Sequence, residues 1–171
     1  MITLVIGGTR SGKSVVAERV VVTYGDTVTY LATAWVDPDD ADHASRIDAH
    51  RRRRPARWRT IECPEPADLP VALASTSGPV LVDSLGTWVA AHPDLTVDAS
   101  SLLEALAAQA DATVVVSEEV GASIHPESPV GRRFVDELGI LNQQVAAIAD
   151  RVLYVVAGRV IELPPADGLT S

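Results

Sequence analysis

One stretch near the start of the chain has the residue types and spacing that hold a phosphate group. It reads Gly7-Gly8-Thr9-Arg10-Ser11-Gly12-Lys13-Ser14 and matches the pattern G-x-x-x-x-G-K-[ST]. The glycines let successive backbone N–H groups curl around a phosphate, and the Ser14 hydroxyl is placed to ligate Mg²⁺. Lys13 is the single lysine beside thirteen arginines. The chain therefore uses a compact ammonium group at the one position where the wider, planar guanidinium group of arginine would contact the phosphates differently. The stretch predicts the phosphate-binding loop (P-loop, residues 7–14) of a nucleoside triphosphate enzyme.

Three carboxylates follow apolar runs, and each has two alternative roles. Asp83 ends the run 80–82, where a Walker B acid holds Mg²⁺ directly or through its water shell. Alternatively Asp83 caps the helix that follows, although Ser84 can also do this. Glu118 and Glu119 follow a later apolar run, where one of them orients a nucleophile or a substrate hydroxyl, or both form a solvated acidic turn.

Residues 46–59 form an arginine-rich stretch, which holds seven of the thirteen arginines in an otherwise acidic chain. Such a run is usually a solvated helix face, but arginine forks also match phosphate oxygens, which would suit a second anion-binding surface. The stretch contains His50, whose ordinary pKa lies near neutrality and whose cationic neighbours favour the neutral, nucleophilic imidazole. His50 is therefore a candidate nucleophile or acid/base.

The elements that must position these residues follow from the apolar pattern. The P-loop lies between a β-branched run and a helix, as a genuine phosphate site requires. The expected strands are 2–6, 27–31, 80–83, 113–117, 152–156 and a hairpin strand at 160–163, and the expected helices are 15–21, 68–75, 99–109 and 129–150. Ser128 and Pro129 are a typical N-cap and first position for the last helix.

This alternation of strands and helices predicts an α/β fold with a mainly parallel sheet covered on both faces. Its ligand should lie beyond the carboxyl ends of the strands. We expect one P-loop nucleotide-binding domain over residues 1–163 and a frayed tail over residues 164–171.

Composition excludes several classes of protein. The formal net charge of −9 disfavours a nonspecific nucleic-acid binder, which needs a basic face. A single cysteine, Cys63, excludes an internal disulfide and a multi-cysteine metal cluster. No leader precedes the first strand and no apolar run approaches the length of a membrane span, so we expect a cytoplasmic protein without an integral membrane segment.

An ordered series of motifs, from Ile2 to about Leu163, resembles the bifunctional adenosylcobinamide kinase/adenosylcobinamide-phosphate guanylyltransferase family of cobalamin biosynthesis. Besides the P-loop, the series consists of Tyr30-Leu31-Ala32-Thr33-Ala34, Arg46-Ile47 with His50, Arg54-Pro55, Trp58-Arg59-Thr60, Leu81-Val82-Asp83-Ser84-Leu85, Trp88-Val89, Val116-Ser117-Glu118-Glu119-Val120-Gly121, Pro126-Glu127, Arg132-Arg133-Phe134 and Leu141-Asn142-Gln143-Gln144. The departures are small. Glu118 stands where many relatives have asparagine, and the segment 90–100 is short compared with some members.

The resemblance implies a RecA-like P-loop fold, commonly a trimer, with two activities. Such enzymes phosphorylate the aminopropanol hydroxyl of adenosylcobinamide with a nucleoside triphosphate, ATP or GTP. They then attach GMP from GTP to a histidine and pass it to the substrate phosphate, giving adenosylcobinamide-GDP. By resemblance, His50 is the GMP-accepting residue, while the P-loop and Walker B patterns predict Ser14 and Asp83 as the Mg²⁺ ligands. The GTP contacts implied in the same way are Gly7, Gly8, Thr9, Arg10, Ser11, Gly12, Lys13, Ser14, Ala32, Thr33, Ala34, Arg51, Arg52, Arg53, Arg54, Glu62 and Asp83.

Two other functions compete with this one. A small-molecule kinase would use the P-loop and Asp83, while the arginine-rich stretch merely binds substrate anions and no guanylyl group is transferred. A RecA-like ATPase or nucleotide-binding regulatory module would act on nucleic acid or on a protein partner, which the net charge argues against.

Overall fold

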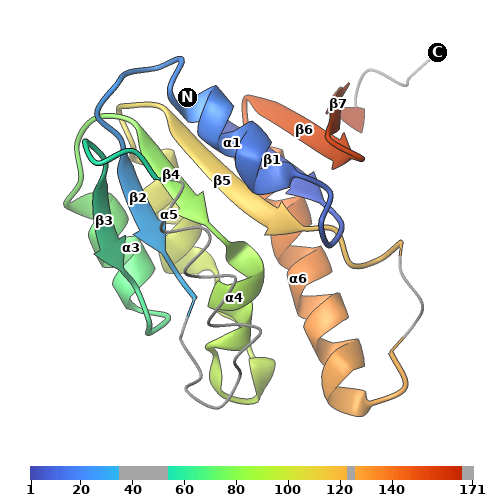
Figure 1. The fold of residues 1–171 in the computed structure, drawn as a ribbon. Coiled ribbons are helices and arrows are strands. Elements are labelled where there is room, and N and C mark those ends of the chain that lie inside the picture. The colour runs from blue at the N-terminus through green and yellow to red at the C-terminus, as the bar shows by residue number, and fades with distance from the viewer. Residues whose placement is uncertain (35–53, 123–125, 167–171) are drawn as a thin grey trace.

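The computed structural model describes residues 1–34, 54–122 and 126–166, and the strands among them form one seven-stranded sheet (Figure 1). The strands are, in chain order, β1 (Ile2–Gly7), β2 (Thr29–Ala32), β3 (Arg59–Glu62), β4 (Val80–Asp83), β5 (Thr113–Glu118), β6 (Arg151–Val156) and β7 (Arg159–Leu163). Their order across the sheet is β3-β2-β4-β5-β1-β6-β7. All neighbouring pairs are parallel except β6 and β7, which form an antiparallel hairpin.

Helices cover both faces of this sheet (Figure 1). Helix α1 (Lys13–Val21) packs on one face, where Val16, Ala17 and Val21 meet apolar residues of the central strands. The opposite face carries α3 (Asp68–Ala74), α4 (Leu85–Ala90), α5 (Ser100–Ala107) and α6 (Pro129–Ile148), together with the short 3₁₀ helix η1 (Pro93–Leu95). The two apolar layers explain why the central strands are mostly apolar, since both sides of each strand are buried.

Strand β5 lies between β1, which leads into the P-loop, and β4, which ends in Asp83. Because all three strands run in the same direction, their carboxyl ends meet at one edge of the sheet. The α/β fold predicted from the sequence, with a mainly parallel sheet and helices on both faces, is confirmed.

All ten predicted elements are present, and their ends differ by at most two residues. The Ser128 hydroxyl accepts a hydrogen bond from the Gly131 amide at 3.1 Å, so the predicted cap of α6 is confirmed. Strand β3 was not predicted, because Arg59-Thr60-Ile61-Glu62 lacks an apolar run. It lies at the edge of the sheet and gains its backbone hydrogen bonds from β2, so pairing rather than hydrophobicity makes it a strand.

Within the described residues, none of the helices has the length and hydrophobicity needed to cross a membrane.

Candidate nucleotide and phosphoryl-transfer site

The P-loop joins β1 to α1 in a tight turn. The backbone N–H of Ser11 donates to the Gly8 carbonyl at 3.2 Å, and Gly12 has φ of 94°, a conformation that favours glycine. A Cβ on Gly7 would lie 2.6 Å from both the Ser11 hydroxyl and the Val155 carbonyl, so only glycine fits there. Helix α1 begins at Lys13, and its first backbone N–H groups therefore face the loop, as phosphate binding requires.

Lys13 folds back over this loop instead of extending into solvent. Its ammonium nitrogen lies 3.5 Å from the Gly8 carbonyl and 3.5 Å from Oε1 of Glu118, and the side chain is only 13% exposed. The ammonium is thus fixed between the P-loop and the end of β5.

Glu118 is held firmly at the end of β5. Its Oε2 accepts hydrogen bonds from the Ser84 hydroxyl at 3.1 Å and from the Gly86 amide at 3.0 Å. The Asn142 amide of α6 donates to the Glu118 carbonyl at 3.0 Å and so fixes the backbone as well. A solvated acidic turn is therefore the wrong interpretation for Glu118.

Glu119 has a different environment. Its carboxylate accepts hydrogen bonds from the backbone N–H groups of Gly121, at 2.9 Å, and Ala122, at 3.2 Å. These bonds close the turn that follows β5. The two adjacent glutamates therefore have different roles: Glu118 faces Lys13, and Glu119 stabilises its own loop.

Asp83 lies at the carboxyl end of β4 and does not cap the following helix. Ser84 is the N-cap residue of α4, and its side chain forms a capping box with Thr87. The Tyr30 hydroxyl instead donates to Oδ2 of Asp83 at 2.6 Å. Burial, reinforced by the negative charge of Asp83, raises the pKa of Tyr30, so the phenol stays protonated and remains a donor.

Arg54, within the arginine-rich stretch, contacts the Tyr30 ring of this pair. Its guanidinium carbon lies 3.5 Å from the centre of the Tyr30 ring, a cation–π contact. Arg57 and Arg59, by contrast, are exposed, and Arg57 lies 3.5 Å from Asp26. Because it packs on the Tyr30 ring, Arg54 is not part of a solvated helix face.

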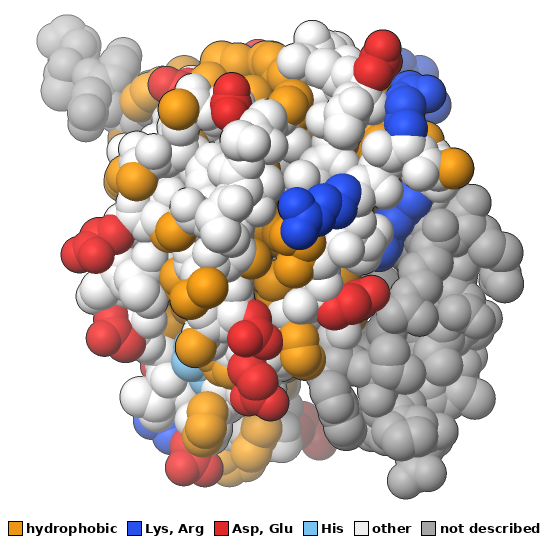
Figure 2. Space-filling view, turned by 90° about the vertical axis from the view of Figure 1, so that its left-hand side faces the viewer, with side chains coloured by type: hydrophobic (Ala, Val, Ile, Leu, Met, Phe, Trp, Pro, Cys, Tyr) orange, Lys and Arg blue, Asp and Glu red, His pale blue; other side chains and the backbone are white. Residues whose placement is uncertain are grey.

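Figure 2 views the molecule from the side of edge strand β3, where Lys and Arg side chains gather mainly toward the upper right and acidic side chains mainly to the left and below.

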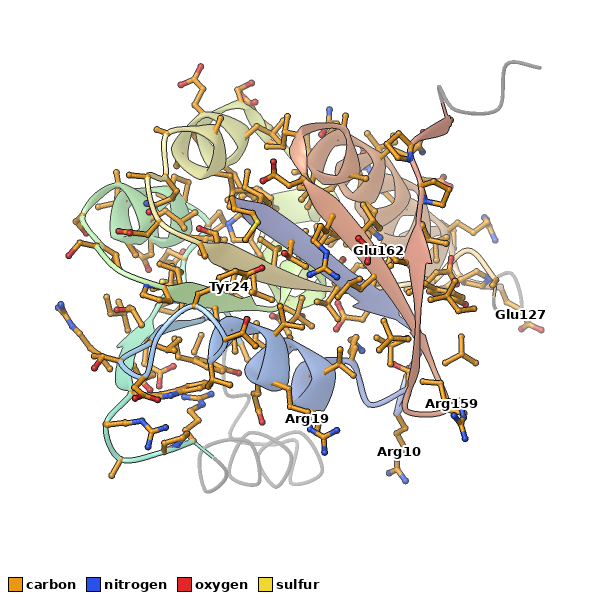
Figure 3. All side chains as sticks on the ribbon, turned by 90° about the horizontal axis from the view of Figure 1, so that it is seen from above. Arg10, Arg19, Tyr24, Glu127, Arg159 and Glu162 are labelled. Carbon is orange, nitrogen blue, oxygen red and sulfur yellow. The ribbon has the colours of Figure 1, made fainter. Side chains whose placement is uncertain are left out.

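The outer rim of the P-loop is also basic. The hairpin turn between β6 and β7 packs against the P-loop, because the Gly158 amide donates to the Ser11 carbonyl at 2.8 Å. Figure 3 shows Arg10 of the loop beside Arg159 of β7, with Arg19 of α1 on the same side. The two exposed guanidinium groups at this rim, those of Arg10 and Arg159, create a positive potential that suits a triphosphate.

A family model described as "Cobinamide kinase / cobinamide phosphate guanyltransferase" matches residues 3–163. The chain belongs to this family. It is 40% identical to the "Bifunctional adenosylcobalamin biosynthesis protein CobP" of Pseudomonas aeruginosa over 164 residues, covering 91% of this chain and 92% of that protein. It is 36% identical to the "Bifunctional adenosylcobalamin biosynthesis protein CobU" of Escherichia coli over 180 residues, covering 92% of this chain and 97% of that protein. The resemblance inferred from the sequence motifs is confirmed.

The remaining residues implied by the family resemblance lie at the carboxyl ends of β2 and β3. Ala32 ends β2, Ala34 lies two residues beyond it, and Glu62 ends β3. Thr33 is fully buried, and its hydroxyl accepts a hydrogen bond from the Ser84 amide at 2.8 Å and lies 2.6 Å from the Thr87 hydroxyl. The GTP contacts implied for these four residues stay predictions. For Thr33, the hydrogen bond to the Ser84 amide shows that its hydroxyl stabilises the junction between β4 and α4.

Four other implied site residues, His50, Arg51, Arg52 and Arg53, lie outside the described residues.

Sequence reasoning assigned no role to Tyr30, Gly86 or Asn142, although each shapes the site. A tyrosine within the apolar run of β2 is one signal, because a buried hydroxyl needs a hydrogen-bond partner. Gly86 and Asn142 gave no such signal. Their partners lie on other elements, so their roles depend on how α4 and α6 pack against β5.

Proposed function

We propose that this chain phosphorylates the hydroxyl of adenosylcobinamide with a nucleoside triphosphate and then transfers GMP from GTP to the new phosphate. The family match over residues 3–163 and the two bifunctional relatives support this proposal. The structural observation that carries it is the position of Lys13, fixed between the P-loop and Glu118 at the sheet edge that also holds Asp83.

In the phosphoryl-transfer half-reaction, the P-loop amides and Lys13 hold the triphosphate and neutralise its charge. The Ser14 hydroxyl and the Asp83 carboxylate lie at the same sheet edge and offer the hard oxygen ligands that Mg²⁺ prefers. The hydrogen bond from Tyr30 orients the Asp83 carboxylate. When bound, Mg²⁺ would withdraw negative charge from the β- and γ-phosphates. ATP and GTP both satisfy the phosphate contacts, because neither the P-loop nor Lys13 contacts the base in this scheme.

In the guanylyl-transfer half-reaction, we propose His50 as the acceptor of GMP. An imidazole nitrogen attacks the α-phosphorus of GTP, and the bond from that phosphorus to the pyrophosphate oxygen breaks. An oxygen of the substrate phosphate then attacks the same phosphorus, the P–N bond breaks, and His50 is regenerated. This assignment is supported by Arg54 of the same stretch, which packs on Tyr30 beside Asp83.

The decisive experiment is incubation of the protein with GTP labelled at the α-phosphate. We expect an acid-labile, base-stable label on the wild-type protein and none on His50→Ala. His92→Ala is the matched control, because His92 packs edge-on against Trp88 at a ring-centre distance of 4.4 Å and is expected to keep the label. A labelled His50→Ala protein contradicts the covalent route. Phosphorylation of adenosylcobinamide without any adduct would identify a single-activity kinase instead.

We further propose a cytoplasmic location and a homo-oligomer, a trimer by family resemblance, without a nucleic-acid partner. The formal net charge of −9 supports the last point.

A further inference from the structure

We propose that Glu118 orients the hydroxyl of the corrinoid substrate and accepts its proton during phosphoryl transfer. This inference rests on the proposed function and adds a catalytic residue to its first half-reaction.

The two oxygens of the Glu118 carboxylate have different surroundings. Oε2 accepts hydrogen bonds from the Ser84 hydroxyl and the Gly86 amide, which belong to the N-terminal end of α4. Oε1 faces Lys13, with its ammonium nitrogen 3.5 Å away. Because a P-loop lysine contacts the β- and γ-phosphates, Oε1 lies next to the position of the phosphorus that is attacked.

The protein is built to keep this carboxylate in place. A Cβ on Gly86 would lie 2.1 Å from Oε2, so glycine at this position allows the carboxylate to dock on α4. The hydrogen bond from Asn142 fixes the Glu118 backbone from the side of α6, and Asn142 is itself bonded to Ser117 at 2.5 Å. The Glu118 side chain is nevertheless 26% exposed, so a substrate can reach it.

This arrangement meets the geometric demands on a general base. The carboxylate is anchored through Oε2, while Oε1 faces the lysine that contacts the β- and γ-phosphates in P-loop enzymes. A neutral amide at this position would orient a hydroxyl but would not take its proton, so the negative charge is the property to test.

In the proposed step, bonds break and form at the substrate hydroxyl and at the γ-phosphorus. The substrate O–H bond breaks and its proton passes to Oε1 of Glu118. The alkoxide oxygen forms a bond to the γ-phosphorus, and the bond from that phosphorus to the bridging oxygen breaks. A nucleoside diphosphate leaves, and Glu118 later releases its proton to solvent.

The test is Glu118→Gln, which keeps an acceptor oxygen for the Gly86 amide but removes the charge. Glu119→Gln is the matched control, because the hydrogen bonds described for the Glu119 side chain are all to the backbone of its own turn. Both half-reactions are measured, the second with adenosylcobinamide phosphate supplied directly. We expect kcat of phosphoryl transfer to fall about 10²-fold in Glu118→Gln with KM for the nucleotide little changed. Guanylyl transfer should fall far less, and Glu119→Gln should behave like the wild type.

An unchanged kcat in Glu118→Gln, or an equal loss in both half-reactions, overturns the proposal. Glu118→Asp is the second variant, since it keeps a carboxylate on a shorter side chain. It should retain more phosphoryl-transfer activity than Glu118→Gln, and a glutamine variant as active as the aspartate variant also refutes the general base. If the wild-type protein itself does not phosphorylate adenosylcobinamide, the proposed function is wrong. If the wild type does so and Glu118→Gln has the same kcat, only the role inferred for Glu118 is wrong.

Discussion

Replacing Gly86 with alanine would place a methyl group where the Glu118 carboxylate lies. The added Cβ would be 2.1 Å from Oε2 of Glu118, so the carboxylate would have to move by about 1 Å or more to reach an ordinary contact distance. That movement breaks the 3.0 Å hydrogen bond from the Gly86 amide and shifts Oε1 relative to Lys13. Because the clash is with the end of a flexible side chain, we expect the fold to survive and the catalytic geometry to change.

The cost in stability follows from two opposing effects. Loss of a hydrogen bond to a charged acceptor costs about 1.5–3 kcal/mol. Alanine in a helix recovers at most about 1 kcal/mol relative to glycine. The free energy of unfolding should therefore fall by roughly 0.5–2 kcal/mol, which lowers Tm by a few degrees in a chain of this size. The phosphoryl-transfer rate should fall about tenfold or more, because misplacement of a catalytic group by about 1 Å is costly.

The assay combines thermal denaturation with the rate of adenosylcobinamide phosphorylation. Gly139→Ala is the matched control, because Gly139 lies within α6 and a Cβ there would meet nothing within 4 Å. The free energy of unfolding of this control should rise by up to about 1 kcal/mol, and its activity should not change. If Gly86→Ala instead keeps the wild-type rate and is as stable as the wild type, the close approach of Glu118 to α4 does not matter for catalysis and the reasoning is refuted.

Three further predictions test other parts of the site. Thr33→Val keeps the shape but removes the hydroxyl that accepts from the Ser84 amide, so the free energy of unfolding should fall by about 1–3 kcal/mol in urea denaturation, more than in Thr33→Ser. Burial, with Asp68 and Glu62 nearby, raises the pKa of the Cys63 thiol to about 11 from the ordinary 9.0. The folded state therefore holds this proton more tightly than the unfolded state, so its contribution to stability is complete below about pH 9 and is lost as the pH rises through about 11. Relative to Cys63→Ala, the wild type should lose stability over that window in pH-dependent denaturation, and parallel curves would disprove the shift. Lys13→Ala should impair both half-reactions in rate assays, and retention of both would show that the P-loop lysine does not serve them.

The sequence was sufficient for the P-loop and for the positions of most strands along the chain, because these follow from local patterns. The residues around Lys13 are contiguous in the chain, and β-branched runs mark the buried strands. Edge strand β3 escaped prediction because its four residues carry two charges and depend on pairing with β2.

The distinction between Glu118 and Glu119 also needed the structure. The two residues have the same side chain and adjacent positions, and they differ only in what approaches them. Glu118 ends β5 and its carboxylate contacts Lys13 and the first turn of α4, whereas Glu119 lies in the following turn and bonds to its backbone. Likewise, Ser84 and not Asp83 caps α4, which is decided by the path of the backbone at the end of β4.

The central claim is that one chain carries out two successive transfers to the same corrinoid. The most direct measurement is product analysis after a single preparation of the wild-type protein is incubated with adenosylcobinamide, ATP and α-labelled GTP. We predict that adenosylcobinamide phosphate forms first and is then converted to labelled adenosylcobinamide-GDP, and that neither product forms with Lys13→Ala. Accumulation of the phosphate without any labelled corrinoid, or no change in adenosylcobinamide, would contradict the claim.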